Sequence, residues 1–329
     1  MNEETFKALV IEETEDKYTI TIKQRKLDDL PDNDLLIKVS YSSLNYKDAL
    51  SATGNKGVTR NYPHTPGIDA VGTVVSDANG KFSQGDNVIV TSYDLGMNTD
   101  GGFAEYIRVP TEWAVALPEG MSPKTSMLFG TAGFTAAQSI SSIVEKVSPQ
   151  DGEILVTGAT GGVGSLSVAI LSKIGYRVCA VTGKKEARDY LEKIGADSVI
   201  TREELNSGAD RPMLKPRWAG VVDCVGGDML TTAIKSTLPL GVITSCGMAA
   251  SPNLVMTVFP FILRGVSLVG IDSQNCPMPL REALWKKMAD EWLPDNLETI
   301  EKTIHLEQLA ENIEAMLEGK QLGRTLVEL

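Results

Sequence analysis

A glycine-rich segment between a predicted strand and a predicted helix is the feature that most restricts the fold of this chain. The apolar run Glu153–Thr157 predicts a buried strand, and Gly162–Ile174 predicts a helix. The segment between them reads Val156-Thr157-Gly158-Ala159-Thr160-Gly161-Gly162-Val163-Gly164. It matches the pattern G-x-G-x-x-G, with Ala159 at the first glycine position. In this context the pattern predicts a phosphate-binding turn, because a helix N-terminus offers free N–H groups and a favourable dipole.

Five consecutive loop residues are therefore predicted to hold the pyrophosphate of a dinucleotide. They are Thr160, Gly161, Gly162, Val163 and Gly164. Gly161 would let the backbone approach the phosphates, and Gly164 would let the helix close on the sheet. A plain glycine-rich turn is the alternative interpretation.

Further strands alternate with helices after this loop. Alternation of this kind predicts a parallel sheet with right-handed crossovers, the doubly wound Rossmann fold of the α/β class, with strand order 3-2-1-4-5-6. The predicted strands are Glu153–Thr157, Arg177–Val181, Ser198–Thr201, Ala219–Cys224, Gly241–Cys246 and Val266–Ile271.

The end of the second strand indicates which dinucleotide binds. An enzyme that uses NAD usually places an acid there to hold the ribose 2′-hydroxyl. Here the sequence reads Thr182-Gly183-Lys184, and Arg202 follows the neighbouring third strand. Lys184 and Arg202 could converge on a 2′-phosphate, which favours NADPH, although both could instead be solvated surface cations. Met248 and Ser273 follow the fifth and sixth strands, so they are also predicted to bind the cofactor.

The first part of the chain has a different pattern. Short runs separated by Gly and Pro predict a β-rich, barrel-like domain. A chain of 329 residues usually folds as two domains. We expect the β-rich domain to comprise residues 1–124 and 272–329, and the dinucleotide-binding domain to comprise residues 125–271. The predicted β-rich strands are Ala8–Glu12, Tyr18–Lys23, Asp34–Tyr41, Asp69–Val75, Asn87–Thr91, Phe103–Val109 and Thr325–Leu329.

Charge and composition exclude several kinds of partner. The net charge of −12 argues against nucleic acids and anionic membranes. No apolar run approaches ~20 residues, and the first ten residues do not form a secretory signal, so we expect a cytoplasmic protein. The four cysteines and two histidines have no metal-ligand spacing, so no metal is expected.

A β-rich domain followed by a nucleotide-binding domain resembles the medium-chain dehydrogenase/reductase superfamily, whose first domain is GroES-like. Zinc-binding members carry Gly-His-Glu-x-x-Gly, whereas this chain has Gly67-Ile68-Asp69-Ala70-Val71-Gly72, with Ile68 at the histidine position. The chain therefore resembles the zinc-independent, quinone-oxidoreductase-like branch. Within it, five segments are similar to the NADPH-dependent acrylyl-CoA reductase group: Ser42–Leu50, Pro66–Asp69, Gly130–Ala136, Pro260–Arg264 and Gly323–Val327.

The resemblance implies hydride transfer from NADPH to the β-carbon of an α,β-unsaturated thioester such as acrylyl-CoA. The resulting enolate needs hydrogen-bond donors. We predict catalytic roles for Asn45, Tyr46, Lys47 and Asp69, with Tyr46 also bordering the cofactor. The alternative for Asp69 is a buried structural carboxylate, and for Lys47 a surface ion pair. Thr131 and Arg324 are further predicted cofactor contacts, with packing and a salt bridge as their alternatives.

Two other functions stay open. One is an NADPH-dependent quinone or free enone reductase, and the other is a nucleotide-regulated binding protein without enzymatic activity. We also expect a homodimer, because Val266–Ile271 would be an apolar edge strand, and such edges invite pairing with a second copy.

Overall fold

The computed structural model describes residues 5–15 and 17–329, and the chain divides into two compact units. Unit 1 contains Met1–Thr131, Gln274–Glu282 and Glu301–Leu329. Unit 2 contains Ala132–Ser273 and Ala283–Ile300, and so carries the glycine-rich loop.

Unit 2 is built on a six-stranded parallel sheet with the order β10-β9-β8-β11-β12-β13. In chain order this is 3-2-1-4-5-6, which confirms the prediction. The central strands are short apolar runs buried on both faces, as a parallel sheet between helices requires. The strands are β8 (Glu153–Val156), β9 (Val178–Thr182), β10 (Ser198–Thr201), β11 (Trp218–Asp223), β12 (Thr237–Ser245) and β13 (Ser267–Gly270).

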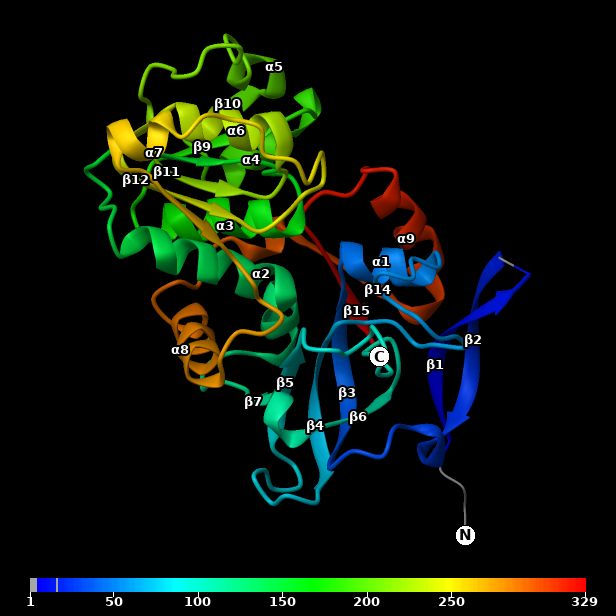
Figure 1. Ribbon diagram of the computed structural model, residues 1–329. Helices are drawn as coiled ribbons and strands as arrows, with labels where there is room; N and C mark the ends of the chain where they lie inside the picture. The colour runs from blue at the N-terminus through cyan, green and yellow to red at the C-terminus, as the bar shows by residue number, and fades with distance from the viewer. Residues whose placement is uncertain (1–4, 16) are drawn as a thin grey trace. The chain divides into compact units, whose positions relative to one another are not determined.

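Helices cover both faces of this sheet (Figure 1). α3 lies on one face, and α5, α6 and α7 lie on the other, where Leu205, Leu230 and Phe261 pack against Val221 and Ile243 of the strands. The helices with residues in this unit are α2 (Pro123–Val144), α3 (Gly162–Lys173), α4 (Arg188–Lys193), α5 (Arg202–Leu205), α6 (Gly227–Lys235), α7 (Phe259–Arg264) and α8 (Met278–Ala289).

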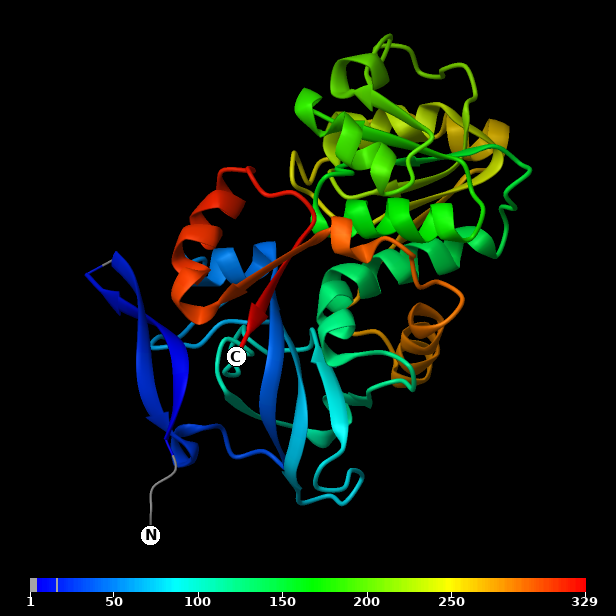
Figure 2. The same ribbon diagram turned by 180° about the vertical axis from the view of Figure 1, so that it is seen from behind.

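Unit 1 is the β-rich unit. Its main sheet has seven strands in the order β14-β15-β3-β4-β5-β7, with β6 paired to β3, and β1 and β2 form a separate hairpin. α1 (Tyr46–Ala52) and α9 (Leu309–Leu317) lie side by side (Figure 2). The strands are β1 (Thr5–Thr14), β2 (Lys17–Lys26), β3 (Leu35–Leu44), β4 (Asp69–Asp77), β5 (Asn87–Thr91), β6 (Tyr106–Val109), β7 (Ala114–Ala116), β14 (Glu301–His305) and β15 (Arg324–Glu328).

The unit boundaries and the strands differ in part from the sequence-based expectation: residues 125–131 belong to unit 1 and residues 272–273 to unit 2. Residues 283–300 belong to unit 2 rather than to the β-rich domain, because Trp285 stacks on Phe134 and Asn296 donates a hydrogen bond to the Lys193 carbonyl. The strand β14 was not predicted, since Glu301–His305 is mostly polar. It forms by pairing in parallel with β15.

Among the residues that the structure describes, one helix, α2, is long and apolar enough to cross a membrane. That stretch is 72% buried inside the protein, which is the environment of a core helix. Gly130 interrupts α2 with a φ of +50°, so the helix is kinked there.

Candidate functional site

The glycine-rich loop of unit 2 has the form that a phosphate requires. Gly158 has a φ of +60°, and Gly161 is the N-cap of α3. A Cβ at Gly164 would lie 2.3 Å from the Gly158 carbonyl oxygen, so only glycine lets the helix close on the turn. The first-turn N–H groups of α3 are thereby presented at the carboxyl edge of the sheet. Thr160 and Gly161 lie in the turn, and Gly162, Val163 and Gly164 form the first turn of α3.

The structure brings the two predicted cations together at the end of β9. A Cβ at Gly183 would lie 2.8 Å from Nε of Arg202, so the guanidinium group rests on the glycine backbone. Lys184 is the next residue, and its N–H donates to Thr182 Oγ1 at 3.0 Å. Burial, with a smaller effect from the charge of Arg202, lowers the pKa of Lys184. Two positive charges held this close favour a ligand with more than one negative charge, such as a phosphate monoester.

A pocket of about 460 Å³ lies beside Arg202 in unit 2. Gly226, the N-cap of α6, and Gly227, its first residue, form part of the wall and have φ of +74° and +58°. The glycine pair shortly after a predicted parallel strand is the sequence signal that could have indicated these residues. The remaining lining residues are Asn206, Asp228, Met229, Ala250, Ser251, Asn253 and Val255.

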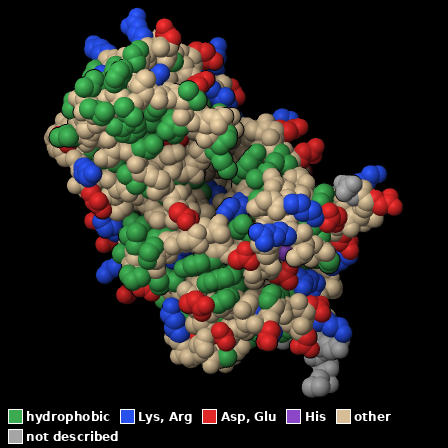
Figure 3. All heavy atoms as spheres, viewed as in Figure 1, with side chains coloured by type: hydrophobic (Ala, Val, Ile, Leu, Met, Phe, Trp, Pro, Cys, Tyr) green, Lys and Arg blue, Asp and Glu red, His purple; other side chains and the backbone are tan. Residues whose placement is uncertain are grey.

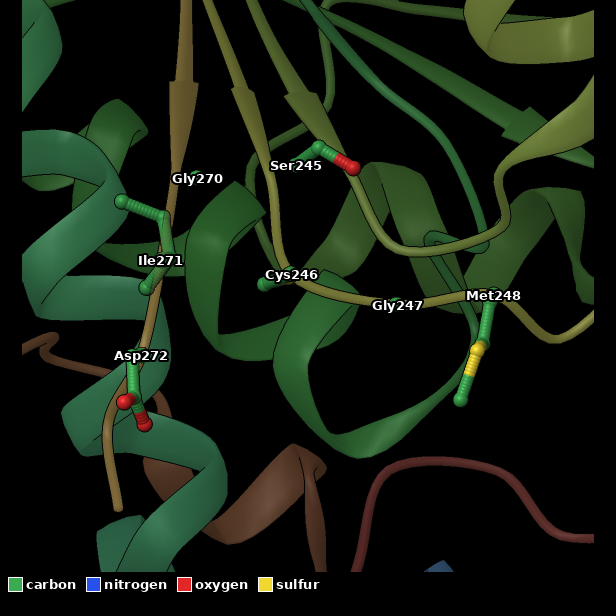
Figure 4. Close-up of a pocket in the computed structure, with 7 residues that line it drawn as sticks. All are labelled: Ser245, Cys246, Gly247, Met248, Gly270, Ile271 and Asp272. Atoms are coloured by element: carbon green, nitrogen blue, oxygen red, sulfur yellow. The ribbon is translucent and has the colours of Figure 1, made fainter. Parts of the chain in front are cut away.

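A second pocket of about 520 Å³ lies where β12 and β13 end (Figure 4). Met248, a predicted cofactor contact, lines it and is 71% exposed. Ser273, another, follows the lining residue Asp272 and is half-buried. Cys246 also lines this pocket and was not selected from the sequence. Both pockets lie at the carboxyl ends of strands, where open α/β sheets bind ligands.

Unit 1 contains a buried polar cluster around Asp69, which is fully buried at the start of β4. Its Oδ2 accepts hydrogen bonds from Ser43 Oγ at 2.6 Å and Asn45 Nδ2 at 2.8 Å. Its Oδ1 accepts from Thr131 N at 2.9 Å and Thr131 Oγ1 at 2.6 Å. Arg324 Nη2 lies 3.6 Å from Oδ2. Four donors and a cation therefore compensate the burial of this carboxylate.

Gly130 makes this arrangement possible. A Cβ at this position would lie 2.4 Å from Asp69 Oδ2 and 2.6 Å from Ser43 Oγ. Its positive φ also turns the backbone so that the next N–H, that of Thr131, points at Asp69. Both features require glycine.

The roles predicted for three residues change in this geometry. Asn45 donates to Ser43 O and Asp69 Oδ2, and its Oδ1 accepts from Arg324 Nη1 at 3.1 Å, so its amide is used within the cluster. Arg324 is 2% exposed and also donates to Leu128 O, so it does not offer its donors to a cofactor phosphate. Asp69 has no exposed surface, so its carboxylate is closed off from any ligand in this structure.

Asp48 is a second fully buried carboxylate in unit 1. Its Oδ2 accepts from Asn45 N at 2.8 Å, and its Oδ1 accepts from Gly67 N at 3.1 Å and Ile68 N at 2.8 Å. It thereby joins the start of α1 to the segment that leads into β4. Burial, and then the charge of Asp69, raise the pKa of Asp48 from 3.8 to about 7.

Tyr46 and Lys47 form the first turn of α1, and both are more accessible than the cluster beneath them. The Tyr46 side chain is 56% exposed. Lys47 is half-buried, and its Nζ donates to Gln274 Oε1 at 2.9 Å. The carboxylate of Asp48, the neighbouring residue, accepts its hydrogen bonds from backbone N–H groups inside unit 1.

The zinc-ligand position of related dehydrogenases is occupied by Ile68, which is 3% exposed. Across residues 5–15 and 17–329, no group of three or more His, Cys, Asp or Glu side chains is placed to hold a metal ion.

Two family models match the chain, one in each part. Residues 31–119 match the alcohol dehydrogenase GroES-like domain, and residues 162–290 match the zinc-binding dehydrogenase domain. Among curated proteins, the chain is 44% identical to the "Putative quinone oxidoreductase YhfP" of Bacillus subtilis, over 98% of this chain and 99% of that one. It is 39% identical to the acrylyl-CoA reductase AcuI of Ruegeria pomeroyi, over 98% and 99% of the two chains.

Solved structures show the same similarity. The Salmonella enterica yhdH oxidoreductase, in complex with NADP, is 38% identical with a TM-score of 0.95, over 98% of this chain and 99% of that one. The Escherichia coli YhdH with bound NADPH is 39% identical with a TM-score of 0.94, over 98% of this chain and 99% of that one. The Bacillus subtilis protein yhfP with NAD bound is 44% identical with a TM-score of 0.97, over 99% and 100%.

A GroES-like unit and a Rossmann unit with an intact phosphate loop define a two-domain, dinucleotide-binding oxidoreductase. The identity over the full length of both chains is specific enough to name the family. The chain belongs to the medium-chain dehydrogenase/reductase family, in its quinone-oxidoreductase-like group. The fold class and the family resemblance are therefore confirmed. NADP or NADPH in two solved relatives supports the predicted cofactor, whereas the third relative holds NAD.

Proposed function

We propose that this protein uses NADPH to reduce an activated carbon–carbon double bond, with acrylyl-CoA converted to propionyl-CoA. The observation that carries the choice of cofactor is the contact of Arg202 with Gly183, beside Lys184. Support for the substrate comes from the acrylyl-CoA reductase that is 39% identical over nearly the full length of both chains.

The residues of unit 2 fit the proposed cofactor. The loop Thr160–Gly164 would hold the pyrophosphate, and Lys184 with Arg202 would bind the 2′-phosphate. Thr182 and Gly183 complete this edge, and Met248 and Ser273 would contact the other end of the molecule. When bound, NADPH supplies a hydride for the reduction.

The residues of unit 1 would act on the substrate. Reduction of an α,β-unsaturated thioester places negative charge on the thioester oxygen, and donors near that oxygen would stabilise it. We assign Tyr46 and Lys47 to this part, since they form the accessible turn of α1. Asn45, Asp69, Thr131 and Arg324 would hold that turn in position through the buried cluster.

We further propose that the reaction needs no metal. The buried Ile68 at the ligand position supports this proposal, because an aliphatic side chain offers no electron pair to zinc. Exhaustive chelation should leave turnover unchanged, whereas activity that chelation removes and zinc restores would contradict it.

Quinone or free enone reduction is the second candidate, and the similarity to the YhfP protein favours it. Free coenzyme A separates the two candidates. It should compete with the substrate of an acyl-CoA reductase, because both carry the same adenosine-phosphate group. An absence of competition, together with faster turnover of a quinone or enone, would support the second candidate.

A further inference from the structure

Two cysteine thiols lie together at the carboxyl edge of the unit 2 sheet. Cys224 follows β11 and Cys246 follows β12, and these strands pair in parallel with Asp223 opposite Ser245. Cys224 and Cys246 are the next residue on each chain segment, so they lie beside each other just beyond the paired ends of the strands. Their sulfur atoms are 3.8 Å apart, and the Cys246 thiol also donates to the Asp223 carbonyl at 3.3 Å.

This geometry is compatible with a covalent bond between the sulfurs. Neighbouring strands lie about 4.8 Å apart, within the Cα separation of roughly 4.4–6.8 Å that disulfides span. The sulfurs must approach from 3.8 Å to about 2 Å, which rotation of two half-buried side chains can supply. Cys246 lines the pocket at the ends of β12 and β13, so this residue borders the space that a small oxidant would enter.

We propose that Cys224 and Cys246 form a redox-active dithiol, which hydrogen peroxide oxidises to a disulfide and a dithiol reductant restores. The Cys246 thiolate attacks a peroxide oxygen, the O–O bond breaks, and the hydroxide released takes up the thiol proton as water. This leaves a sulfenic acid on Cys246. The sulfur of Cys224 then attacks it, the S–S bond forms, and the departing hydroxide leaves as water with the proton of Cys224. Two thiols and one peroxide thus give one disulfide and two waters.

The order of these steps follows from the surroundings of the two thiols. The hydrogen bond with Cys246, and then burial, raise the pKa of the Cys224 thiol. Cys224 is therefore the poorer first nucleophile, while Cys246 lines the open pocket.

The bond would affect the nucleotide site, an inference that rests on the proposed function. The Cys224 N–H donates to Thr157 Oγ1 at 3.0 Å, and Thr157 directly precedes the phosphate loop. A Cβ at Gly247 would lie 2.2 Å from the Cys224 carbonyl oxygen, so the two loops pack backbone against backbone. Because the S–S bond would link the two loops that pack beside the phosphate loop, oxidation should weaken NADPH binding by roughly five- to hundredfold, the usual range of coupling between two sites.

Thiol mapping of the full chain tests the proposal. The reduced protein is treated with hydrogen peroxide, denatured, alkylated and digested. We expect two of the four thiols to be lost, one cross-linked peptide pair that contains Cys224 and Cys246, and full reversal by dithiothreitol. The Cys246→Ser variant should give no cross-link. The Cys179→Ser variant is the matched control and should behave as the parent, since Cys179 is fully buried.

Two results would overturn the proposal. One is that Cys224 and Cys246 both remain alkylatable after peroxide treatment, and the other is their oxidation to sulfinic acids without a cross-link. Mapping needs no nucleotide, so it does not depend on the proposed function. NADPH binding is then measured on reduced and oxidised samples. If the reduced protein fails to bind NADPH, the proposed function fails while the mapping result stands.

Discussion

Arg324 and Asp69 form a buried ion pair in unit 1, with 3.6 Å between Nη2 and Oδ2 and almost no solvent exposure of either side chain. Ser43 lies between them, donating to Asp69 and accepting from Arg324, both at 2.6 Å. The pair therefore depends on a hydroxyl bridge as well as on direct attraction between the charges.

Arg324→Met should lower the free energy of unfolding by about 3–5 kcal/mol, because it leaves the Asp69 carboxylate buried without its cation. Urea denaturation measures this change. Lys320→Ala is the control: Lys320 pairs with Glu318 at the surface, and its loss should leave stability unchanged within error. A similar stability for Arg324→Met and the parent would show that the cluster does not depend on this charge.

The structure also predicts a pH dependence from Asp48. Because the pKa of Asp48 is about 7 in the folded protein and 3.8 is its ordinary value, the folded state binds more protons than the unfolded state between these values. The contribution of Asp48 to stability is therefore complete below about pH 4 and is lost as the pH rises towards 7.

Asp48→Asn should remove the part of the pH dependence of the unfolding free energy that Asp48 contributes. Urea denaturation of both proteins at several pH values between 4 and 8 gives the comparison. The absolute stability of Asp48→Asn will also change. In the parent, Asp48 Oδ2 accepts a hydrogen bond from the Asn45 N–H, and in the variant an amide NH2 group would face that N–H instead. If the unfolding free energies of the parent and the variant change with pH in the same way, the raised pKa of Asp48 is contradicted.

Lys184→Ala should weaken NADPH binding by roughly ten- to hundredfold and leave NADH binding nearly unchanged, because only NADPH carries the 2′-phosphate. Titration of the bound nucleotide by fluorescence gives both affinities. Lys185→Ala, at the exposed neighbouring position, is the matched control and should bind both nucleotides as the parent does. Equal losses for NADPH and NADH in Lys184→Ala would remove Lys184 from the phosphate site.

We propose that the protein is a homodimer that pairs through the edge strand β13. Leu268 on this strand is 36% exposed, and Ile262 and Leu263 of α7 are 72% and 69% exposed. Figure 3 shows hydrophobic side chains gathered on this part of unit 2. An exposed apolar edge strand is a ready template for a second copy.

Light scattering at micromolar concentration measures the assembly. The parent should have twice the chain mass of 35.4 kDa. Leu268→Lys should shift it towards the monomer, while Leu322→Lys, an equally exposed leucine in unit 1, should not. A parent of monomer mass would exclude the dimer.

The Rossmann unit was largely predictable from the sequence, because buried parallel strands are continuous apolar runs and a glycine loop marks the first of them. The convergence of Lys184 and Arg202 was also predictable, since strand order places their two strand ends side by side. The buried cluster of unit 1 was not. Its members come from four distant segments, and no local pattern shows that Gly130 turns the backbone towards Asp69.

For the same reason the role of Asn45 could not be settled from the sequence. Its position in the segment Ser42–Leu50 indicated a site residue, but not that Asp69 and Arg324 occupy its amide. Which of its hydrogen bonds form depends on Arg324, a residue 279 positions away in the chain.

NADPH-dependent reduction of acrylyl-CoA can be measured directly on the purified protein. Purified protein, treated with a chelator, is mixed with acrylyl-CoA and NADPH, while NADPH absorbance and acyl-CoA products are followed together. We expect one propionyl-CoA to form for each NADPH consumed, with much slower turnover on NADH. No propionyl-CoA with acrylyl-CoA, but rapid NADPH consumption with a quinone, would contradict the assigned substrate.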